Sequence, residues 1–273
     1  MTIRIGCIPY LNTRPLISAL LDERQAAAPP GAAYRIVFET PARLAELLAA
    51  GEVDVGLLPS VEYYRGEDLR LLPDISIAGQ GPAESVRLFL RRPLTELARV
   101  GLDPASRTSA ALLRVILAER RRGATIEYVA TLPETDPAAD ASLDAWLIIG
   151  DPGLRYAPPA GVAALDLGQA WWELSRLPFV FAVWAVRAKA DLGEVATKLR
   201  LAKYASRSSL ADLARREAAR LALPYPQVFH YLRDVMRYDL SPAELGGLTA
   251  FYRYCVKWSL APEGGQVRFY GER

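Results

Sequence analysis

Residues 53–65 of this chain read VDVGLLPSVEYYR, and this stretch predicts a buried strand followed directly by a helix. Val53–Leu58 is apolar apart from one acid, as in a strand that is covered on both faces. Pro59–Ser60 turns the chain, and Val61–Gly66 has helical character. A buried strand that leads at once into a helix is typical of α/β proteins whose strands run mostly parallel.

The segments on the amino-terminal side repeat this alternation. Ile3–Ile8 and Tyr34–Glu39 have strand patterns, and the second of them alternates apolar with polar residues. Thr40 followed by Pro41 predicts a helix start, because threonine caps a first turn well and proline fits the first helical position. Gly51 supplies the carboxyl-terminal stop of that helix. The first part of the chain therefore predicts one αβ unit.

A second block of alternating elements follows the first. Ser85–Leu90, Ala145–Ile149 and Phe179–Val186 have apolar strand patterns. Thr108–Arg122 has a helical pattern with an apolar inner face. Leu192–Lys257 differs from both blocks, because it is helical in pattern and has almost no strand signal.

We therefore predict a two-lobed α/β fold with a helical carboxyl-terminal segment. The chain is expected to cross to the second lobe near Leu88 and to return near Val183. The predicted first lobe comprises residues 1–88 and 184–273, with the last helices packed back on it. The predicted second lobe comprises residues 89–183.

The composition restricts the class of protein. Hydrophobic residues make up 51% and charged residues 23% of the chain, as in ordinary globular proteins, which excludes disorder of the whole chain. The formal net charge is +2, so no dense basic face is indicated and we expect no nucleic-acid partner. No apolar run reaches the ~18 residues that span a bilayer. With no secretion signal before the first strand, and with Cys7 and Cys255 far apart, we expect a cytoplasmic protein without a membrane partner, although one disulfide stays open.

The motifs of the common enzyme classes are missing. The sequence has no GxSxG, HExxH, P-loop or GxGxxG motif and no residue cluster with metal-ligand spacing, so we expect neither a metal nor a cofactor. His230 is the single histidine, and we expect a structural or surface role for it, away from the candidate ligand-binding turns. Trp171 and Trp172 either line a pocket or pack in a core.

Four strand-to-helix turns are candidates for a ligand site: Pro9–Asn12, Pro59–Ser60, Thr108–Ser109 and Gly150–Asp151. Ligands of open α/β sheets bind beyond the carboxyl ends of strands, where helix N-termini offer free N–H groups and a partial positive charge. Helix capping explains each turn taken alone. Together the turns predict a cleft that closes around a small anion.

Several segments together resemble one family. They are IPYLNTRPL (Ile8–Leu16), DVGLLPSVEYYR (Asp54–Arg65), ESVRLFLRRPL (Glu84–Leu94), SRTSAALLRVIL (Ser106–Leu117), IIGDPGLRY (Ile148–Tyr156) and WWELSRLPFVFAVWA (Trp171–Ala185). The pattern resembles chorismate dehydratase of the futalosine route to menaquinone, over nearly the whole chain. The resemblance implies a periplasmic-binding-protein-like fold of type II. It also implies an enzyme that removes water from chorismate to give 3-[(1-carboxyvinyl)oxy]benzoate.

The same resemblance assigns roles to particular residues. Asn12 and Ser85 map to the family's functional positions, where they are expected to hydrogen-bond the departing hydroxyl or the enolpyruvyl carboxylate. Ser60, Thr108 and Ser109 map to carboxylate-binding positions.

The proton acceptor is less constrained. The substrate's own carboxylate is one candidate, because aromatisation of the ring reduces the need for a strong protein base. Asp151 is the alternative base and a predicted substrate-binding residue, unless it only caps a helix or joins the lobes. Arg14 and Arg87 either pair with a substrate carboxylate or lie on the surface.

Two other functions stay open at this point. The sister family makes 1,4-dihydroxy-6-naphthoate with a histidine base after the strand that corresponds to Ala145–Ile149, where this chain has Gly150–Asp151 instead. A solute-binding protein without catalytic activity would share the fold, but such receptors are exported.

Overall fold

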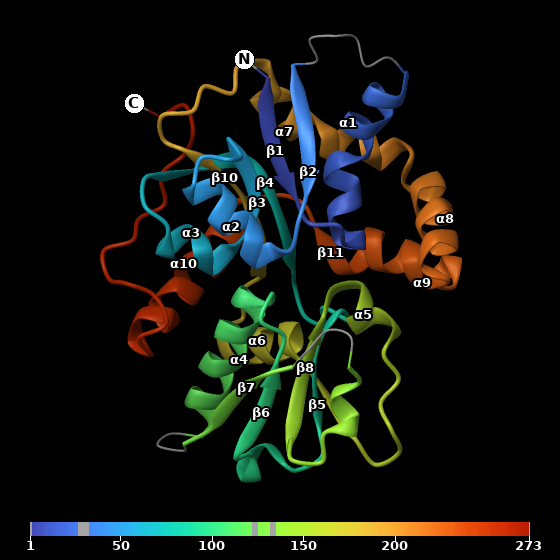
Figure 1. Ribbon diagram of the computed structural model, residues 1–273, viewed down its shortest axis with the longest axis vertical. Helices are drawn as coiled ribbons and strands as arrows, with labels where there is room; N and C mark the ends of the chain where they lie inside the picture. Colours follow the sequence, from blue (N-terminus) through green and yellow to red (C-terminus); the bar gives the residue numbers. More distant parts are fainter. Residues whose placement is uncertain (1, 27–32, 122–124, 132–134, 273) are drawn as a thin grey trace.

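The computed structural model describes residues 2–26, 33–121, 125–131 and 135–272. Two lobes are stacked along the long axis of the molecule, and each is built around one mixed β-sheet (Figure 1). Both marked chain ends lie on the upper lobe in this view. The predicted two-lobed α/β fold is therefore confirmed.

The larger sheet has the strand order β11-β4-β10-β3-β1-β2. Its strands are β1 (Ile3–Cys7), β2 (Tyr34–Phe38), β3 (Val55–Pro59), β4 (Leu69–Gly79), β10 (Phe179–Arg187) and β11 (Met236–Arg237). β1 pairs in parallel with β2 and β3, whereas β10 pairs antiparallel with both β3 and β4. β1 to β4 therefore share one direction, as the alternation of strand and helix predicted.

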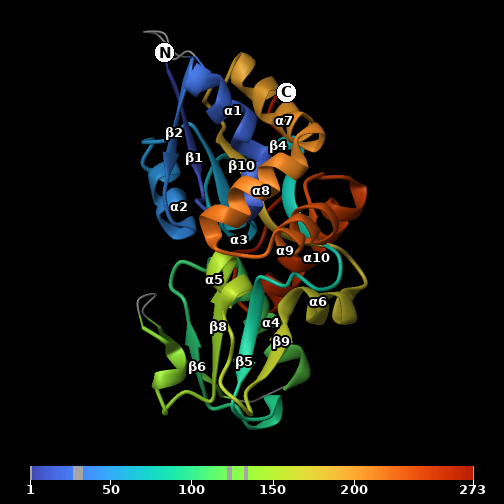
Figure 2. The same ribbon diagram turned by 90° about the vertical axis from the view of Figure 1, so that its right-hand side faces the viewer.

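Helices pack on both faces of the larger sheet, with α2 on one face and α1 and α7 on the other (Figure 2). They are α1 (Arg14–Ala26), α2 (Pro41–Ala49), α3 (Ser60–Arg65), α7 (Glu194–Ser208), α8 (Leu210–Leu221), α9 (Tyr225–His230) and α10 (Pro242–Lys257), together with the 3-10 turn η1 (Leu11–Thr13) and the π-helical segment η4 (Tyr231–Val235). Thr40 caps α2 as predicted, because its side chain accepts a hydrogen bond from the N–H of Arg43 at 3.3 Å. The packing of α7 against α1 returns the carboxyl-terminal helices to this lobe.

The smaller sheet has the strand order β7-β6-β8-β5-β9. Its lobe contains β5 (Val86–Leu90), η2 (Leu94–Glu96), β6 (Arg99–Leu102), α4 (Arg107–Arg120), β7 (Glu127–Ala130), η3 (Pro137–Ala139), β8 (Ala145–Ile149), α5 (Gly150–Arg155), β9 (Ala163–Asp166) and α6 (Leu167–Ser175). β6 pairs in parallel with β7 and β8, whereas β5 runs antiparallel to β8 and β9. α4 begins one residue before its predicted start, and Arg122, its predicted last residue, lies outside the described residues.

The chain crosses between the lobes in two short segments, residues 80–85 between β4 and β5 and residues 176–178 between α6 and β10. β5 belongs wholly to the smaller sheet and β10 wholly to the larger one, so the expected crossing points, Leu88 and Val183, fall inside strands. The apolar runs of the two strands do not reveal which sheet each one joins. The lobe limits at 88/89 and 183/184 stay a prediction.

An aromatic cluster surrounds the second crossing segment. The fully buried ring of Trp171 stands edge-on to Phe179 and Phe251, with ring centroids 5.5 and 5.9 Å away. Its indole N–H donates to the carbonyl oxygen of Pro178 at 3.3 Å. Trp171 therefore packs in a core that joins α6, β10 and α10, and it does not line a ligand pocket. Trp172 lines a surface hollow beside the first crossing segment.

Asp54, in the turn before β3, joins β1 to β10. Its carboxylate accepts hydrogen bonds from the backbone N–H and the guanidinium of Arg4, and it lies 3.0 Å from the guanidinium of Arg187. The hydrogen bonds from Arg4, more than any other contact, hold the pKa of Asp54 at about 2, below its ordinary value of 3.8.

We expect Asp54→Asn to lower the free energy of unfolding by about 2 kcal/mol at neutral pH. Because the pKa of Asp54 is lower in the folded protein, the stabilisation is present above the ordinary pKa of 3.8 and is lost as the pH falls towards about 2. Urea unfolding of both proteins across this range measures the difference. A difference that stays constant down to the lowest pH would contradict the assignment.

Candidate active site

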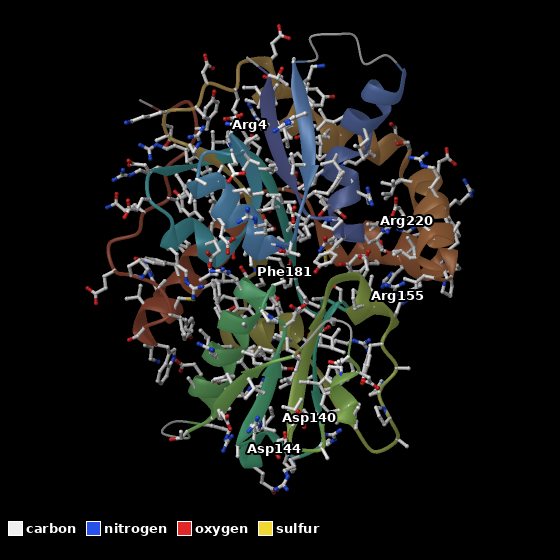
Figure 3. The ribbon with its side chains drawn as sticks, in the orientation of Figure 1. Arg4, Asp140, Asp144, Arg155, Phe181 and Arg220 are labelled. Carbon is white, nitrogen blue, oxygen red and sulfur yellow. The ribbon has the colours of Figure 1, made fainter. Side chains whose placement is uncertain are left out.

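A cavity lies where the two lobes meet, near the level at which Figure 3 labels Phe181. Residues of both lobes line it, among them Tyr10, Asn12, Ser85, Thr108, Ser109 and Phe181. Its volume of about 60 Å³ is far below the ~300–1,000 Å³ of typical small-molecule sites. The cavity between the lobes is therefore smaller here than typical small-molecule sites.

Asn12 reaches the cavity from the turn that follows β1. The N–H of Thr13 closes this turn on the carbonyl oxygen of Tyr10 at 3.1 Å, and α1 begins directly afterwards. The hydroxyl of Thr13 lies 3.4 Å from Asn12 Oδ1 and donates to it. The predicted placement of Asn12 beyond the carboxyl end of a strand therefore agrees with the structure.

Ser85 ends the first crossing segment, so it stands between the lobes. Glu84 before it has a left-handed backbone conformation with φ 58°, and the carboxylate of Asp166 accepts the N–H groups of Ala83 and Glu84 at 2.9 and 2.7 Å. Asp166 is also the N-cap of α6, so the segment is fixed to that helix start. The hydroxyl of Ser85 is buried and lies 2.9 Å from the hydroxyl of Tyr231.

Gly153 supports Ser85 from the side of α5. A Cβ atom at this position would lie 2.2 Å from the carbonyl oxygen of Ser85, so only glycine allows the close approach. Arg87 donates through Nε to the carbonyl oxygen of Gly153 at 3.0 Å and through Nη2 to that of Tyr156 at 2.9 Å. Its guanidinium thus holds backbone carbonyls beside the site. Arg14 does not line the cavity either, and its Nε lies 3.5 Å from Glu217 Oε2.

The amino terminus of α4 forms one wall of the cavity. Its N-cap residue Ser106 makes no side-chain capping bond, and its buried hydroxyl has no hydrogen-bond partner within the described part of the chain. Thr108 accepts the N–H of Val61 at 3.2 Å, across the lobe boundary, and Ser109 is buried beside it. Arg107 is the one charged residue among the described residues that line the cavity. Free N–H groups, hydroxyls and a cation at a helix start favour a carboxylate.

The structure does not bring Ser60 and Asp151 to the cavity wall. Ser60 is fully buried, and among the described residues its hydroxyl has no partner. Asp151 accepts the N–H of Leu11 at 2.7 Å and lies 3.3 Å from Arg220, which Figure 3 shows on the right-hand side of the larger lobe. Burial raises the pKa of Asp151. Asp151 therefore joins the lobes, and a contact with substrate stays a prediction for both residues.

His230 lies on the surface, as expected, and the residues that it contacts lie outside the four candidate turns. His230 Nε2 lies 3.3 Å from Glu84 Oε1, and Glu84 precedes Ser85. Its Nδ1 lies 3.0 Å from Asp234 Oδ2, and this bond is the main cause that raises the pKa of His230. The side chain is exposed and does not line the cavity. A contact between residues so distant in sequence leaves no local pattern.

Two residues of the site were missed in the sequence. Asp166 stands directly before a helical pattern, and that N-cap signal could have been found, although not its contact with the crossing segment. Tyr231 carries no local signal, because its contact with the site is made to Ser85, which lies far away in the sequence at the end of the first crossing segment.

Over the described ranges of the chain, no three His, Cys, Asp or Glu side chains gather as a group able to hold a metal. None of the helices described here is both long and apolar enough to cross a membrane.

Comparison with known proteins decides the family. The sequence model of a family described as menaquinone biosynthesis matches residues 3–257. The chain belongs to this menaquinone biosynthesis family. A chorismate dehydratase of Thermus thermophilus is 34% identical over 261 residues, which cover 90% of this chain and 93% of that protein. The resemblance stated from the sequence motifs is confirmed.

Solved structures agree on the fold of this family member. A protein from Archaeoglobus fulgidus superposes with a TM-score of 0.75 at 17% identity and covers 95% of this chain and 98% of its own. A Candida albicans protein that exhibits the generic periplasmic binding protein fold superposes with a TM-score of 0.64 at 10% identity, covering 100% and 99% of the two chains. At such identities the likeness shows the fold alone, and that fold is periplasmic-binding-protein-like.

Proposed function

We propose that this protein is a chorismate dehydratase of menaquinone biosynthesis, which removes water from chorismate to give 3-[(1-carboxyvinyl)oxy]benzoate. Family membership and the dehydratase from Thermus thermophilus support the activity. The observation that carries the proposal is that Asn12 and Ser85, far apart in sequence, line one interlobe cavity.

The amino terminus of α4 suits one of the two carboxylates of chorismate. The hydroxyl of Ser106 and the backbone N–H groups of the first helical turn offer donors, and Arg107 offers a positive charge. The guanidinium of Arg107 now lies 3.5 Å from Glu62 and 3.6 Å from Glu46, both on the other lobe. Binding would exchange these carboxylates for that of the substrate.

The reaction breaks two bonds of the ring. The C–H bond on the ether-bearing carbon gives its electron pair to a new ring double bond, and the neighbouring C–O bond releases hydroxide, which leaves with a proton as water. The product ring is aromatic, which drives the elimination. The hydroxyl of Ser85 donates to the departing oxygen and stabilises its developing negative charge, and Asn12 holds the substrate beside it.

In this mechanism the enolpyruvyl carboxylate of the substrate takes the proton from the ring carbon and passes it to the departing hydroxide, so that one water molecule leaves and the carboxylate is regenerated. The described residues that line the cavity include no aspartate, glutamate, histidine or lysine. Tyr10, which does line it, has a pKa raised to about 12, chiefly by burial, so its phenol stays protonated at neutral pH. Apolar neighbours such as Val86 and Phe181 exclude water from the site.

The position after β8 argues against the sister activity. Gly150 has φ 65°, and a Cβ atom there would lie 3.0 Å from the ring of Tyr10. A histidine at this position would therefore be strained and would collide with Tyr10. The next residue, Asp151, has its carboxylate oxygens engaged with Leu11 and Arg220.

The activity is tested by incubating the purified protein with chorismate, without added metal or nucleotide, and identifying the products by mass. We expect 3-[(1-carboxyvinyl)oxy]benzoate and water. Tight binding of chorismate with no product over hours would instead indicate a solute-binding protein. Formation of 1,4-dihydroxy-6-naphthoate from the cyclic futalosine intermediate would indicate the sister enzyme.

We further propose that the protein acts in the cytoplasm, with chorismate as its partner and with neither a membrane nor a nucleic acid. The formal net charge of +2 supports the last point. Cys7 and Cys255 are free and buried thiols, which fits a reducing compartment.

A further inference from the structure

We propose that Tyr231 is the positioning residue that turns the proton of the Ser85 hydroxyl towards the substrate, an assignment that rests on the dehydratase activity proposed above. The Tyr231 side chain is 1% exposed and does not line the cavity. Its hydroxyl lies 2.9 Å from Ser85 Oγ, so it stands directly behind the residue that faces the substrate.

Tyr231 adjoins both residues on which the proposed reaction depends. Burial raises the pKa of Tyr231, whereas the hydroxyl of Ser85 and the side chain of Asn12 act to lower it. Tyr231 is also the first residue of η4, a π-helical segment, and such segments are rare and frequently occur at functional sites.

The proposed role assigns a direction to the hydrogen bond between Tyr231 and Ser85, in which either hydroxyl could be the donor. Thr13 donates to Asn12 Oδ1, and in the proposed arrangement the amide N–H of Asn12 faces the Tyr231 hydroxyl. The phenol donates its single proton to Ser85 Oγ. Ser85 therefore has its own proton free to point into the cavity, at the departing hydroxyl. Burial raises the pKa of Tyr231, so the phenol keeps the proton that this order requires.

Removing the phenol oxygen frees the Ser85 hydroxyl to rotate among its staggered positions, in some of which its proton points away from the substrate. We expect Tyr231→Phe to lower kcat about 10- to 100-fold, with KM nearly unchanged. The ring and its packing stay in place. The contact between His230 and Glu84 still holds η4 to the crossing segment.

Chorismate turnover of four proteins tests the assignment: wild type, Tyr231→Phe, Ser85→Ala and the double variant. If Tyr231 acts through Ser85, its substitution lowers kcat in the wild type and has no further effect once Ser85 is alanine. Tyr238→Phe is the matched control, because among the described residues its buried hydroxyl has no hydrogen-bond partner. This control should turn over chorismate as the wild type does.

Each other outcome overturns the assignment. An equal loss of kcat in both backgrounds would show a structural role, and so would a Tyr231→Phe protein that fails to fold. An unchanged kcat in the single variant would show that the Ser85 hydroxyl needs no partner. A wild-type protein that makes no product would overturn the dehydratase activity itself, together with the role of Tyr231 in it.

Discussion

Replacing Ser85 by alanine should lower kcat for chorismate by about 10²–10³-fold while the protein stays folded. In the proposed mechanism the hydroxyl removed donates to the departing oxygen, and this contact strengthens most as negative charge develops there. Alanine leaves the backbone contacts of this position with Ala83 and Gly153 unchanged. Steady-state kinetics with product quantified by mass measures the loss, and circular dichroism checks the fold.

Another buried serine serves as the matched control. Ser76 in β4 is fully buried, and its hydroxyl donates to the carbonyl oxygen of Asp239 at 2.7 Å, outside the cavity. Ser76→Ala should cost about 1 kcal/mol of stability and leave kcat unchanged. If Ser85→Ala instead raised KM and left kcat intact, Ser85 would bind substrate without acting on the bond that breaks.

A large loss of stability is expected from Gly247→Ala in α10. The added Cβ atom would lie 1.9 Å from the carbonyl oxygen of Pro178, in the second crossing segment. The carbonyl group of Pro178 and helix α10 cannot move apart independently, because Trp171 donates a hydrogen bond to this carbonyl oxygen and also packs against Phe251 of α10. The helix must move away from the crossing, and we expect a loss of about 3 kcal/mol in the free energy of unfolding.

The neighbouring glycine gives the comparison. A Cβ atom at Gly246 would have its nearest neighbour in the side chain of Leu177 at 4.0 Å. Gly246→Ala should therefore be neutral or should stabilise the protein by up to ~1 kcal/mol, since alanine is the better helix former. Denaturant unfolding of both variants decides the matter. Equal effects at the two positions would show that α10 does not approach Pro178 so closely.

Much of the fold was predictable where local chemistry determines it. The cap at Thr40 and the buried run of β3 have signatures within a few residues, and both were placed correctly. β4 was not assigned from the sequence. Pro73 and Asp74 interrupt its pattern, Asp74 has φ 68°, and the pairing with β10 shifts register along its length. A strand of that kind is defined by its partner, which lies far away in the sequence.

The site divides in the same way. Asn12, Ser85, Thr108 and Ser109 were predicted by resemblance, and the structure brings all of them to one cavity. An aspartate at position 151 could be predicted to bind substrate, but the sequence could not show that its carboxylate accepts hydrogen bonds from the backbone N–H of Leu11 and from Arg220. Such pairings depend on how two lobes meet, and no spacing along the chain encodes them.

The place of β10 in the larger sheet has a consequence for synthesis on the ribosome. β10 fills the position between β3 and β4 and hydrogen-bonds to both, yet it is made only after every element from β5 to α6. The amino-terminal strands are therefore synthesised with an open place in their sheet, and all five strands of the smaller sheet are made before that place can be filled. The larger lobe closes last, and its closing strand anchors the second connection between the lobes.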